Sequence, residues 1–314
     1  MILVTAVIFF LIVSNHNAKK TRSIFKGNLR DSAENLSYST LNKIESILKA
    51  VEKVPQQIAY SLEGSSYTKE DLLLLIRQIV ENNSEIYGST IAFEPYMFDP
   101  DSFFFAPYFY KQKDEIKFTY IGSESYKYFS WDWYKIPKEN NKPMWSEPYF
   151  DEGAGNIIMS TYSVPFYQIL KGERKLLGIV TADISLAWLQ KMVSSIKIAE
   201  TGFAFLILKK GNLITYPRQD LVMNHTIFSL ADKFNKPELH KLGKSMITGE
   251  TNFISKKHLF TGEDAWLFYA PLPSNGWSLG VIFPQKELLA GINKLEIELH
   301  IFAATGLALL LLAI

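Results

Sequence analysis

The 314-residue chain contains no cysteine. It can therefore form neither a disulfide framework nor a thiolate metal site, and a location outside the cytoplasm has to be argued from other features. The chain also lacks an excess of charge of one sign: 33 Lys and Arg residues stand against 32 Asp and Glu residues, for a formal net charge of +1. Without a strongly basic surface, nucleic acid is not expected as a partner.

Motifs of catalysis and nucleotide binding are missing as well. The sequence contains no G-x-S-x-G, H-E-x-x-H, G-x-x-x-x-G-K-[ST] or G-x-G-x-x-G pattern. The five histidines are dispersed, with no spacing typical of metal ligands. We therefore expect no catalytic residues, no bound metal and no cofactor.

Two long uncharged runs lie at the ends of the chain, at residues 2–13 and 301–314. Each is shorter than the roughly 20 residues that cross a bilayer. Because both reach a chain end, we expect two truncated transmembrane helices, at residues 1–13 and 299–314. The alternatives are a signal peptide for the first run, which lacks a basic start and a cleavage site, and a buried helix for the second.

A basic cluster follows the first apolar run: Lys19, Lys20, Arg22, Lys26 and Arg30. The positive-inside rule would place these residues in the cytoplasm, but loops longer than about 60 residues are translocated largely regardless of charge. We therefore expect a protein of the inner or plasma membrane whose central part faces the periplasm or the extracellular space.

The length suits two domains of about 100 to 200 residues each. Apolar residues recur at steps of three and four over residues 32–60, which predicts an amphipathic helix. We expect a stalk helix over residues 14–62, and a second helix announced by the capping pair Thr68 and Asp71. Part of the stalk, residues 22–41, has few domain contacts available, so we expect a parallel homodimer through it.

Short β-rich segments follow in two groups. The first group lies at residues 89–93, 103–110, 116–121, 157–166 and 176–184, and we expect its last three members to be neighbours in one antiparallel sheet. The second group lies at residues 203–208, 213–216, 251–255, 265–269 and 277–283. Helices are expected after each group, at residues 186–193 and 285–299. The pattern predicts an α+β fold with two modules, at residues 63–195 and 196–298; the second lies nearer the membrane because its last helix leads into the final apolar run.

The segment of residues 126–151 stands out because it combines three Trp residues with four acidic residues between two expected strands. Its rings could belong to the core. The alternation of Trp131, Asp132 and Trp133 inside a polar loop favours a ligand cup instead, in which rings provide apolar walls and cation–π faces and carboxylates bind a cation.

Five phrases carry a resemblance to a known family: WYKIPKENNKPMWSEPYFD, STYSVPFY, GIVTADISLAWL, ETGFAFLILKKGNLITYP and FYAPLPSNGWSLGVIFPQKEL. In this order, over roughly residues 32–299, they resemble the double Cache sensors of bacterial receptors. The resemblance implies two PAS-like modules, each with a central antiparallel sheet, and a ligand in the membrane-distal module.

Amino-acid-binding members of this family share a pocket pattern, and the resemblance carries it over residue by residue. The matching positions are Tyr126, Trp133, Tyr134, Tyr149, Asp151 and Asp183. The family's arginine, which pairs with the ligand's carboxylate, is replaced by Trp131. The chain thus resembles the amine-binding half of the pattern and departs from the carboxylate-binding half.

The carboxylates also have structural interpretations: Asp183 as a cap for the helix that begins after Ser185, and Asp151 as a turn residue before Gly153. We predict a ligand sensor for a small amine, followed by an output domain beyond this chain. The alternatives are a sensor of amino acids, with Lys135 replacing the missing arginine, a sensor of another metabolite, a membrane-anchored extracytoplasmic enzyme, and a dimerisation module with an empty pocket.

Overall fold

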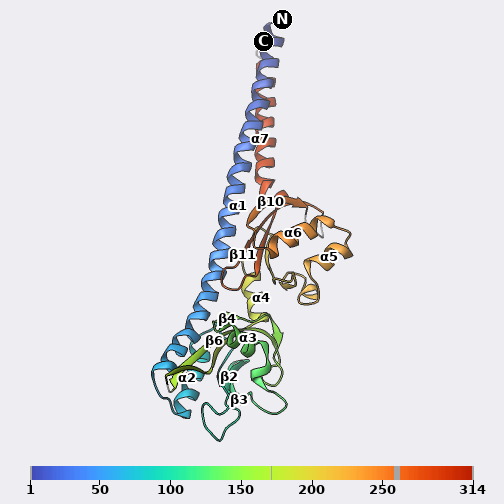
Figure 1. Cartoon of the computed structure of the whole chain (residues 1–314). Helices are drawn as coiled ribbons and strands as arrows, with labels where there is room; N and C mark the ends of the chain where they lie inside the picture. The colour runs from blue at the N-terminus through green and yellow to red at the C-terminus, as the bar shows by residue number, and fades with distance from the viewer. Residues whose placement is uncertain (1, 171, 258–261, 313–314) are drawn as a thin grey trace.

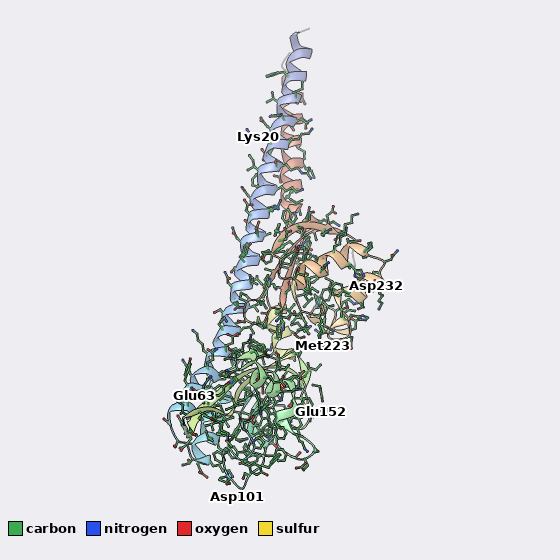
Figure 2. All side chains as sticks on the ribbon, viewed as in Figure 1. Lys20, Glu63, Asp101, Glu152, Met223 and Asp232 are labelled. Carbon is green, nitrogen blue, oxygen red and sulfur yellow. The ribbon has the colours of Figure 1, made fainter. Side chains whose placement is uncertain are left out.

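The computed structural model describes residues 2–170, 172–257 and 262–312, and its shape is elongated (Figure 1). One long helix, α1 (Ile2–Gly64), runs along the molecule, and two sheet-containing modules lie on one side of it. The C-terminal helix α7 (Gln285–Leu312) lies beside the N-terminal half of α1, so both termini are at the same end. The side chains around Lys20 belong to this helical end, whereas those around Glu63 and Asp101 belong to the opposite end (Figure 2).

Helix α1 extends in both directions beyond the periodic segment that predicted it. Its apolar stripe is buried against both modules, with Ile44, Leu48 and Val51 at most 2% exposed. No helix of the described residues contains a stretch long and apolar enough to cross a membrane. Met1, Ala313 and Ile314, at the outer ends of the two expected spanning segments, lie outside the described residues. The membrane spans therefore remain a prediction.

Helix α2 (Lys69–Asn82) begins at the predicted capping box, in which Thr68 Oγ1 accepts a hydrogen bond from the Asp71 backbone N–H and the Asp71 carboxylate accepts one from that of Thr68. It packs against the same face of the first sheet as α1, through buried side chains that include Leu72 and Ile76.

The first module is built on a seven-stranded antiparallel sheet in the order β3-β2-β1-β7-β6-β4, with β5 beside β6. The strands are β1 (Gly88–Phe93), β2 (Pro107–Gln112), β3 (Glu115–Tyr120), β4 (Met144–Trp145), β5 (Tyr149–Phe150), β6 (Ile158–Leu170) and β7 (Glu173–Ser185). The predicted neighbours β6 and β7 do pair, but β3 does not join them. A two-residue turn containing Lys113, which has a left-handed backbone, pairs β3 with β2 at the sheet edge instead.

Alternation along β7 assigns its side chains to two different layers. Val180, Ala182 and Ile184 belong to the core that α1 covers. Thr181 and Asp183 line a cavity on the opposite face. This polar pair, in the buried second half of the strand, thus faces away from the stalk helix.

The segment expected as a loop between strands contains regular structure. A 3-10 turn, η1 (Tyr128–Ser130), precedes helix α3 (Asp132–Asn140), which ends at Asn141 in a left-handed conformation. Its nine residues include Pro137, and this short, polar and proline-containing helix has little of the periodicity that identifies longer ones.

Helix α4 (Leu186–Ser194) connects the first module to a five-stranded antiparallel sheet in the order β10-β11-β12-β8-β9. The strands are β8 (Phe203–Ile207), β9 (Leu213–Thr215), β10 (Asn252–Lys257), β11 (Asp264–Pro271) and β12 (Ser278–Pro284). A 3-10 turn, η2 (Gln219–Leu221), follows β9. Two helices that were not predicted, α5 (Ile227–Lys233) and α6 (Pro237–Ile247), lie on the side away from α1 (Figure 1). The predicted fold class is confirmed: α+β, with a long N-terminal helix and two antiparallel modules.

Candidate ligand-binding site

Two buried carboxylates, Asp151 and Asp183, line one small cavity in the first module. Their residues are 3% and 2% exposed. The cavity has a volume of about 10 Å³. Of the other residues singled out in the sequence, Tyr126, Trp133 and Tyr149 also line it. The structure adds six lining residues that the sequence did not single out: Thr90, Tyr108, Ile121, Met159, Thr161 and Thr181.

The strand register positions Asp183 in the middle of the sheet. On β7 it lies opposite Gly88 of β1 on one side and Thr161 of β6 on the other. Tyr108, on β2, donates a hydrogen bond from its hydroxyl to Asp183 Oδ2 at 2.9 Å. The second oxygen, Oδ1, has no hydrogen-bond partner within the part of the chain that the structure describes. This buried oxygen is available to a ligand.

Gly88 gives Tyr108 room to reach the carboxylate. A Cβ atom built on Gly88 would lie 2.1 Å from the Tyr108 hydroxyl oxygen, far inside a van der Waals contact. The tyrosine of β2 therefore crosses β1 over a glycine before it meets Asp183 on β7. Any side chain at this position would have to displace the hydroxyl that holds Asp183.

Burial raises the pKa of Asp183 to about 7, because the charged form loses its hydration. The hydroxyls of Thr161 and Tyr108 lower this pKa, and the charge of Asp151 raises it. The site thus holds a carboxylate whose ionisation is costly without a cation. Asp183 does not cap the following helix, as one alternative proposed, because Ser185 Oγ accepts the hydrogen bond from the Trp188 backbone N–H.

Asp151 has both of the roles that the sequence suggested: it stabilises a turn, and it lines the cavity. Its Oδ2 accepts a hydrogen bond from the Gly155 N–H at 2.9 Å, which fixes the turn that follows β5. Gly153 in this turn has φ +101°, a conformation that favours glycine. Burial raises the pKa of Asp151, and the Gly155 hydrogen bond lowers it.

Aromatic rings form one wall of the cavity. Tyr126 stacks on Trp131 with ring centroids 5.1 Å apart. Trp131 in turn lies 6.2 Å from the ring of Tyr149, whose hydroxyl shares a 2.8 Å hydrogen bond with Thr161 Oγ1. Trp131 therefore backs the cavity wall from outside, and Trp133 lines the cavity directly.

Tyr134 lies in a different environment from the other six residues. Its side chain is fully buried, and its hydroxyl donates a hydrogen bond to Glu94 Oε1 at 2.8 Å. Lys138 pairs with the same carboxylate at 2.8 Å. Tyr134 is not among the cavity-lining residues. Lys135, the cation considered as a substitute for the arginine, is exposed, and its nearest charged partner is Glu139 at 3.9 Å.

The described lining residues include two carboxylates and no Lys, Arg or His. Several tyrosine and threonine hydroxyls accompany them. Such a cavity is suited to hold a small cation by charge-assisted hydrogen bonds and ring contacts. The signal for the added residues was the presence of Thr90, Thr161 and Thr181 on buried strands, because buried polar side chains are uncommon there.

Residues 72–191 match a family model described as "Methyl-accepting chemotaxis protein-like, first PDC sensor domain". Among curated proteins, the chain is 25% identical over 205 residues to the methyl-accepting chemotaxis protein McpC of Bacillus subtilis, a match that covers 63% of this chain. It is 27% identical over 154 residues, or 48% of this chain, to McpG of Pseudomonas putida. These matches span only 27% and 21% of the two relatives.

Solved structures resemble the chain over most of its length. The extracellular domain of mmHK1S-Z3, named as a histidine kinase, superposes with a TM-score of 0.70 at 25% identity, covering 84% of this chain and 97% of that one. The ligand-binding domain of the amino acid chemoreceptor PctB of Pseudomonas aeruginosa, in complex with L-Gln, superposes with a TM-score of 0.57 at 17% identity, covering 85% and 98%.

The family model describes a sensor domain and the solved neighbour is an extracellular domain, which favours a sensor over the enzyme alternative. Residues 72–191 are thus similar to the first PDC sensor domain of methyl-accepting chemotaxis proteins, and the described residues have the fold of an extracellular sensor domain such as that of mmHK1S-Z3.

Proposed function

We propose that the chain is the extracytoplasmic sensing region of a membrane receptor, and that its first module binds a small amine as the ammonium cation. One observation carries this proposal: Asp183 Oδ1 is buried and unpaired among the described residues, in a cavity that also contains Asp151 and no basic side chain. Tyr126, Trp133 and Tyr149 would surround the cation. Trp131 would support the wall, and Tyr134 would support α3 from behind.

The energetics favour a cation in this position. Each charge-assisted hydrogen bond to a carboxylate contributes about 1.5–3 kcal/mol, and a desolvated cation–π contact contributes about 2 kcal/mol. After the cost of association, such a set of contacts is sufficient for micromolar affinity. The cavity volume of about 10 Å³ corresponds to room for about one water molecule, so the site fits an ammonium group and a larger ligand requires the lining side chains to move.

The same cavity disfavours a free amino acid. An α-carboxylate would enter beside two carboxylates, without a basic partner among the described lining residues, and would be desolvated at a cost of several kcal/mol. PctB has been solved with L-Gln and with L-Arg, so an amino-acid sensor is the second candidate. It requires a cation to reach the cavity, and Lys135 is engaged on the outer side of α3.

A route for signal transmission is provided by the strands that line the cavity, because the same strands contact α1. The strands that carry Asp183 and Thr161, β7 and β6, pack with their opposite face on α1, which also contacts β11 and β12 of the second module. We propose that ligand binding shifts this arrangement, and that α1 and α7 carry the shift through membrane segments at residues 1–13 and 299–314. An output domain would follow this chain.

The decisive experiment compares matched pairs of ligands by isothermal titration calorimetry. Ethylamine is tested against alanine and isobutylamine against valine, so that each pair differs only by the α-carboxylate. We expect micromolar binding of the amines and none of the amino acids. Asp183→Ala is expected to weaken the amine by about tenfold to a few hundredfold, whereas Lys135→Gln is the matched control and leaves it unchanged. Tight binding of the amino acids, with the amines ignored, would falsify the proposal.

A further inference from the structure

The second module contains a cavity of its own, separate from the amine site. It lies between the sheet and helices α5 and α6, and its volume is about 90 Å³. Phe205 and Leu267 line it from the sheet, Ile227 from α5 and Leu242 from α6. Each of these four side chains is less than 10% exposed, so the interior wall is apolar.

A gap of this kind is unusual for a packed core. Protein interiors are packed as densely as organic crystals, with few voids larger than a water molecule. Cavities lined by Leu, Ile and Phe stay dry and take up apolar molecules. The interior of this cavity is therefore suited to a hydrocarbon group.

The mouth of the cavity is basic. Lys236 precedes α6, and Lys256 and Lys257 end β10; Glu238 is the one carboxylate among the described lining residues. Within the part of the chain that the structure describes, none of the three lysines takes part in an ion pair. Three ammonium groups against one carboxylate favour an anion at the entrance.

We propose that this cavity is a second ligand site, which binds a medium-chain monocarboxylate. The hydrocarbon chain would lie between α6 and the sheet, and the carboxylate would lie at the mouth near Lys236, Lys256 and Lys257. The second module would then sense an amphiphilic anion independently of the amine site in the first.

Octanoate is the probe, compared with octan-1-ol, which has the same chain without the charge. We expect octanoate to raise the melting temperature and to bind more tightly than octan-1-ol by calorimetry. The double variant Lys256→Gln with Lys257→Gln should weaken octanoate about three- to tenfold and leave octan-1-ol unchanged. Lys241→Gln, an exposed lysine of α6 outside the cavity lining, is the matched control and should have no effect.

Two further variants test the interior. Leu242→Trp fills the cavity from α6, and Ala265→Leu narrows it from β11, so that one remains informative if the other fails to fold. Both should abolish octanoate binding, while Asp183→Asn leaves it intact because the amine site is separate. The proposal is overturned if octanoate fails to bind, or if it binds the two filled variants as tightly as the parent. It is also overturned if the lysines serve only to bind anionic phospholipid vesicles and free octanoate has no effect.

Discussion

Tyr108 on β2 and Asp183 on β7 meet across the strand that separates them, joined by a 2.9 Å hydrogen bond that passes over Gly88. The bond satisfies one oxygen of the carboxylate and leaves the other without a partner among the described residues. A buried acid with one fixed and one open oxygen is oriented before any ligand arrives. Reduced loss of freedom on binding strengthens affinity.

Removing this hydrogen bond is expected to weaken amine binding through the ionisation of Asp183. The Tyr108 hydroxyl lowers the pKa of Asp183, so Tyr108→Phe should raise that pKa above about 7 and leave more of the carboxyl protonated at neutral pH. We expect a loss of about three- to tenfold in affinity at pH 7, measured by calorimetry, and a smaller loss at pH 8.5. Tyr110→Phe is the control, because Tyr110 stacks on Tyr108 without lining the cavity. An equal loss at both pH values would contradict the ionisation argument.

The affinity for amines should increase with pH as Asp183 loses its proton. Its pKa of about 7 means that below this value the cation must displace a proton from the carboxyl. We expect the affinity to rise with pH up to about 7 and then to stay level until the amine itself deprotonates, near pH 10. Calorimetry at several pH values, in buffers of different ionisation enthalpy, should detect proton release on binding at pH 6. A pH-independent affinity between 5.5 and 8.5 would argue that another group holds the cation.

The raised pKa of Asp183 also predicts that the stability of the unliganded protein depends on pH. A carboxyl with a pKa near 7 when folded and about 3.9 when unfolded holds an extra proton in the folded state between these values. The free energy of unfolding therefore decreases as pH rises from about 4 to 7, and this stability stays lost above pH 7. Asp183→Asn should be more stable than the parent at pH 8 by about 1–3 kcal/mol. Urea denaturation at pH 8 and pH 4 tests this, because the difference should shrink at pH 4.

Much of the fold follows from local patterns, whereas the site depends on pairing between distant segments. Period-two alternation puts Thr181 and Asp183 on one face of β7, and the Thr68 capping box sets the start of α2. Tyr108 could not be found in this way. Its approach to Asp183 depends on β1 lying between β2 and β7 and on a glycine at one register position, and neither is visible in a single segment.

Residues that are neighbours in the sequence need not face the same site, and helix α3, which the sequence did not predict, shows why. Trp133 and Tyr134 are neighbours in the pattern, but consecutive residues of an α-helix point about 100° apart, so only one of them can face a small cavity. Trp133 faces it, and Tyr134 bonds to Glu94. Helices α5 and α6 were missed for a similar reason, since each is short and separated from its neighbours by polar turns.

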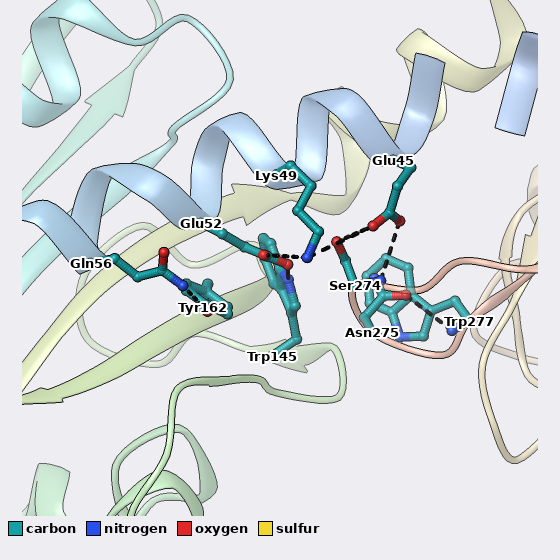
Figure 3. A network of polar contacts seen from close by, with 9 residues as sticks. All are labelled: Glu45, Lys49, Glu52, Gln56, Trp145, Tyr162, Ser274, Asn275 and Trp277. Carbon is teal, nitrogen blue, oxygen red and sulfur yellow. Dashed lines mark hydrogen bonds and ion pairs between the residues drawn. The ribbon is translucent and has the colours of Figure 1, made fainter. Parts of the chain in front are cut away.

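Glu52 of α1 should be a stability determinant of the contact between the stalk and the first module. It is 5% exposed, accepts a hydrogen bond from Trp145 Nε1 at 2.9 Å and pairs with Lys49 at 2.9 Å (Figure 3). Nearer the N-terminus of the same helix, Glu45 accepts a 2.6 Å hydrogen bond from Ser274 Oγ of the second module (Figure 3). One face of α1 thus holds both modules.

Glu52→Ala would leave the buried indole N–H of Trp145 without its acceptor, which costs about 1–3 kcal/mol. We expect the free energy of unfolding in urea to decrease by this amount. Lys49→Gln is the matched control: the Lys49 side chain is half-exposed, so its ion pair should contribute at most about 1 kcal/mol. If Glu52→Ala unfolds at the same urea concentration as the parent, the contact is dispensable and the connection between α1 and the first module lies elsewhere.

Self-association is expected through residues 22–41, in the part of α1 that extends beyond the two modules. Helix α7 packs against α1, yet Ile24, Phe25 and Leu36 remain 55%, 44% and 40% exposed. Apolar side chains along one helix favour burial against a second copy, and a parallel arrangement keeps both apolar chain ends on the same side. We predict a parallel homodimer through residues 22–41.

Sedimentation equilibrium in detergent, with both apolar chain ends retained, measures this dimerisation. The double variant Phe25→Lys with Leu36→Lys, two exposed positions on one face of the helix, should weaken the dimer at least tenfold, because each protomer would bury two charges at the interface. Leu74→Lys is the control, since Leu74 is also exposed, at 57%, but lies on α2 at the far end of the molecule. A strict monomer at high protein concentration, or a dimer that only Leu74→Lys disrupts, would move the interface away from the stalk, because residues 22–41 would then contribute nothing to assembly.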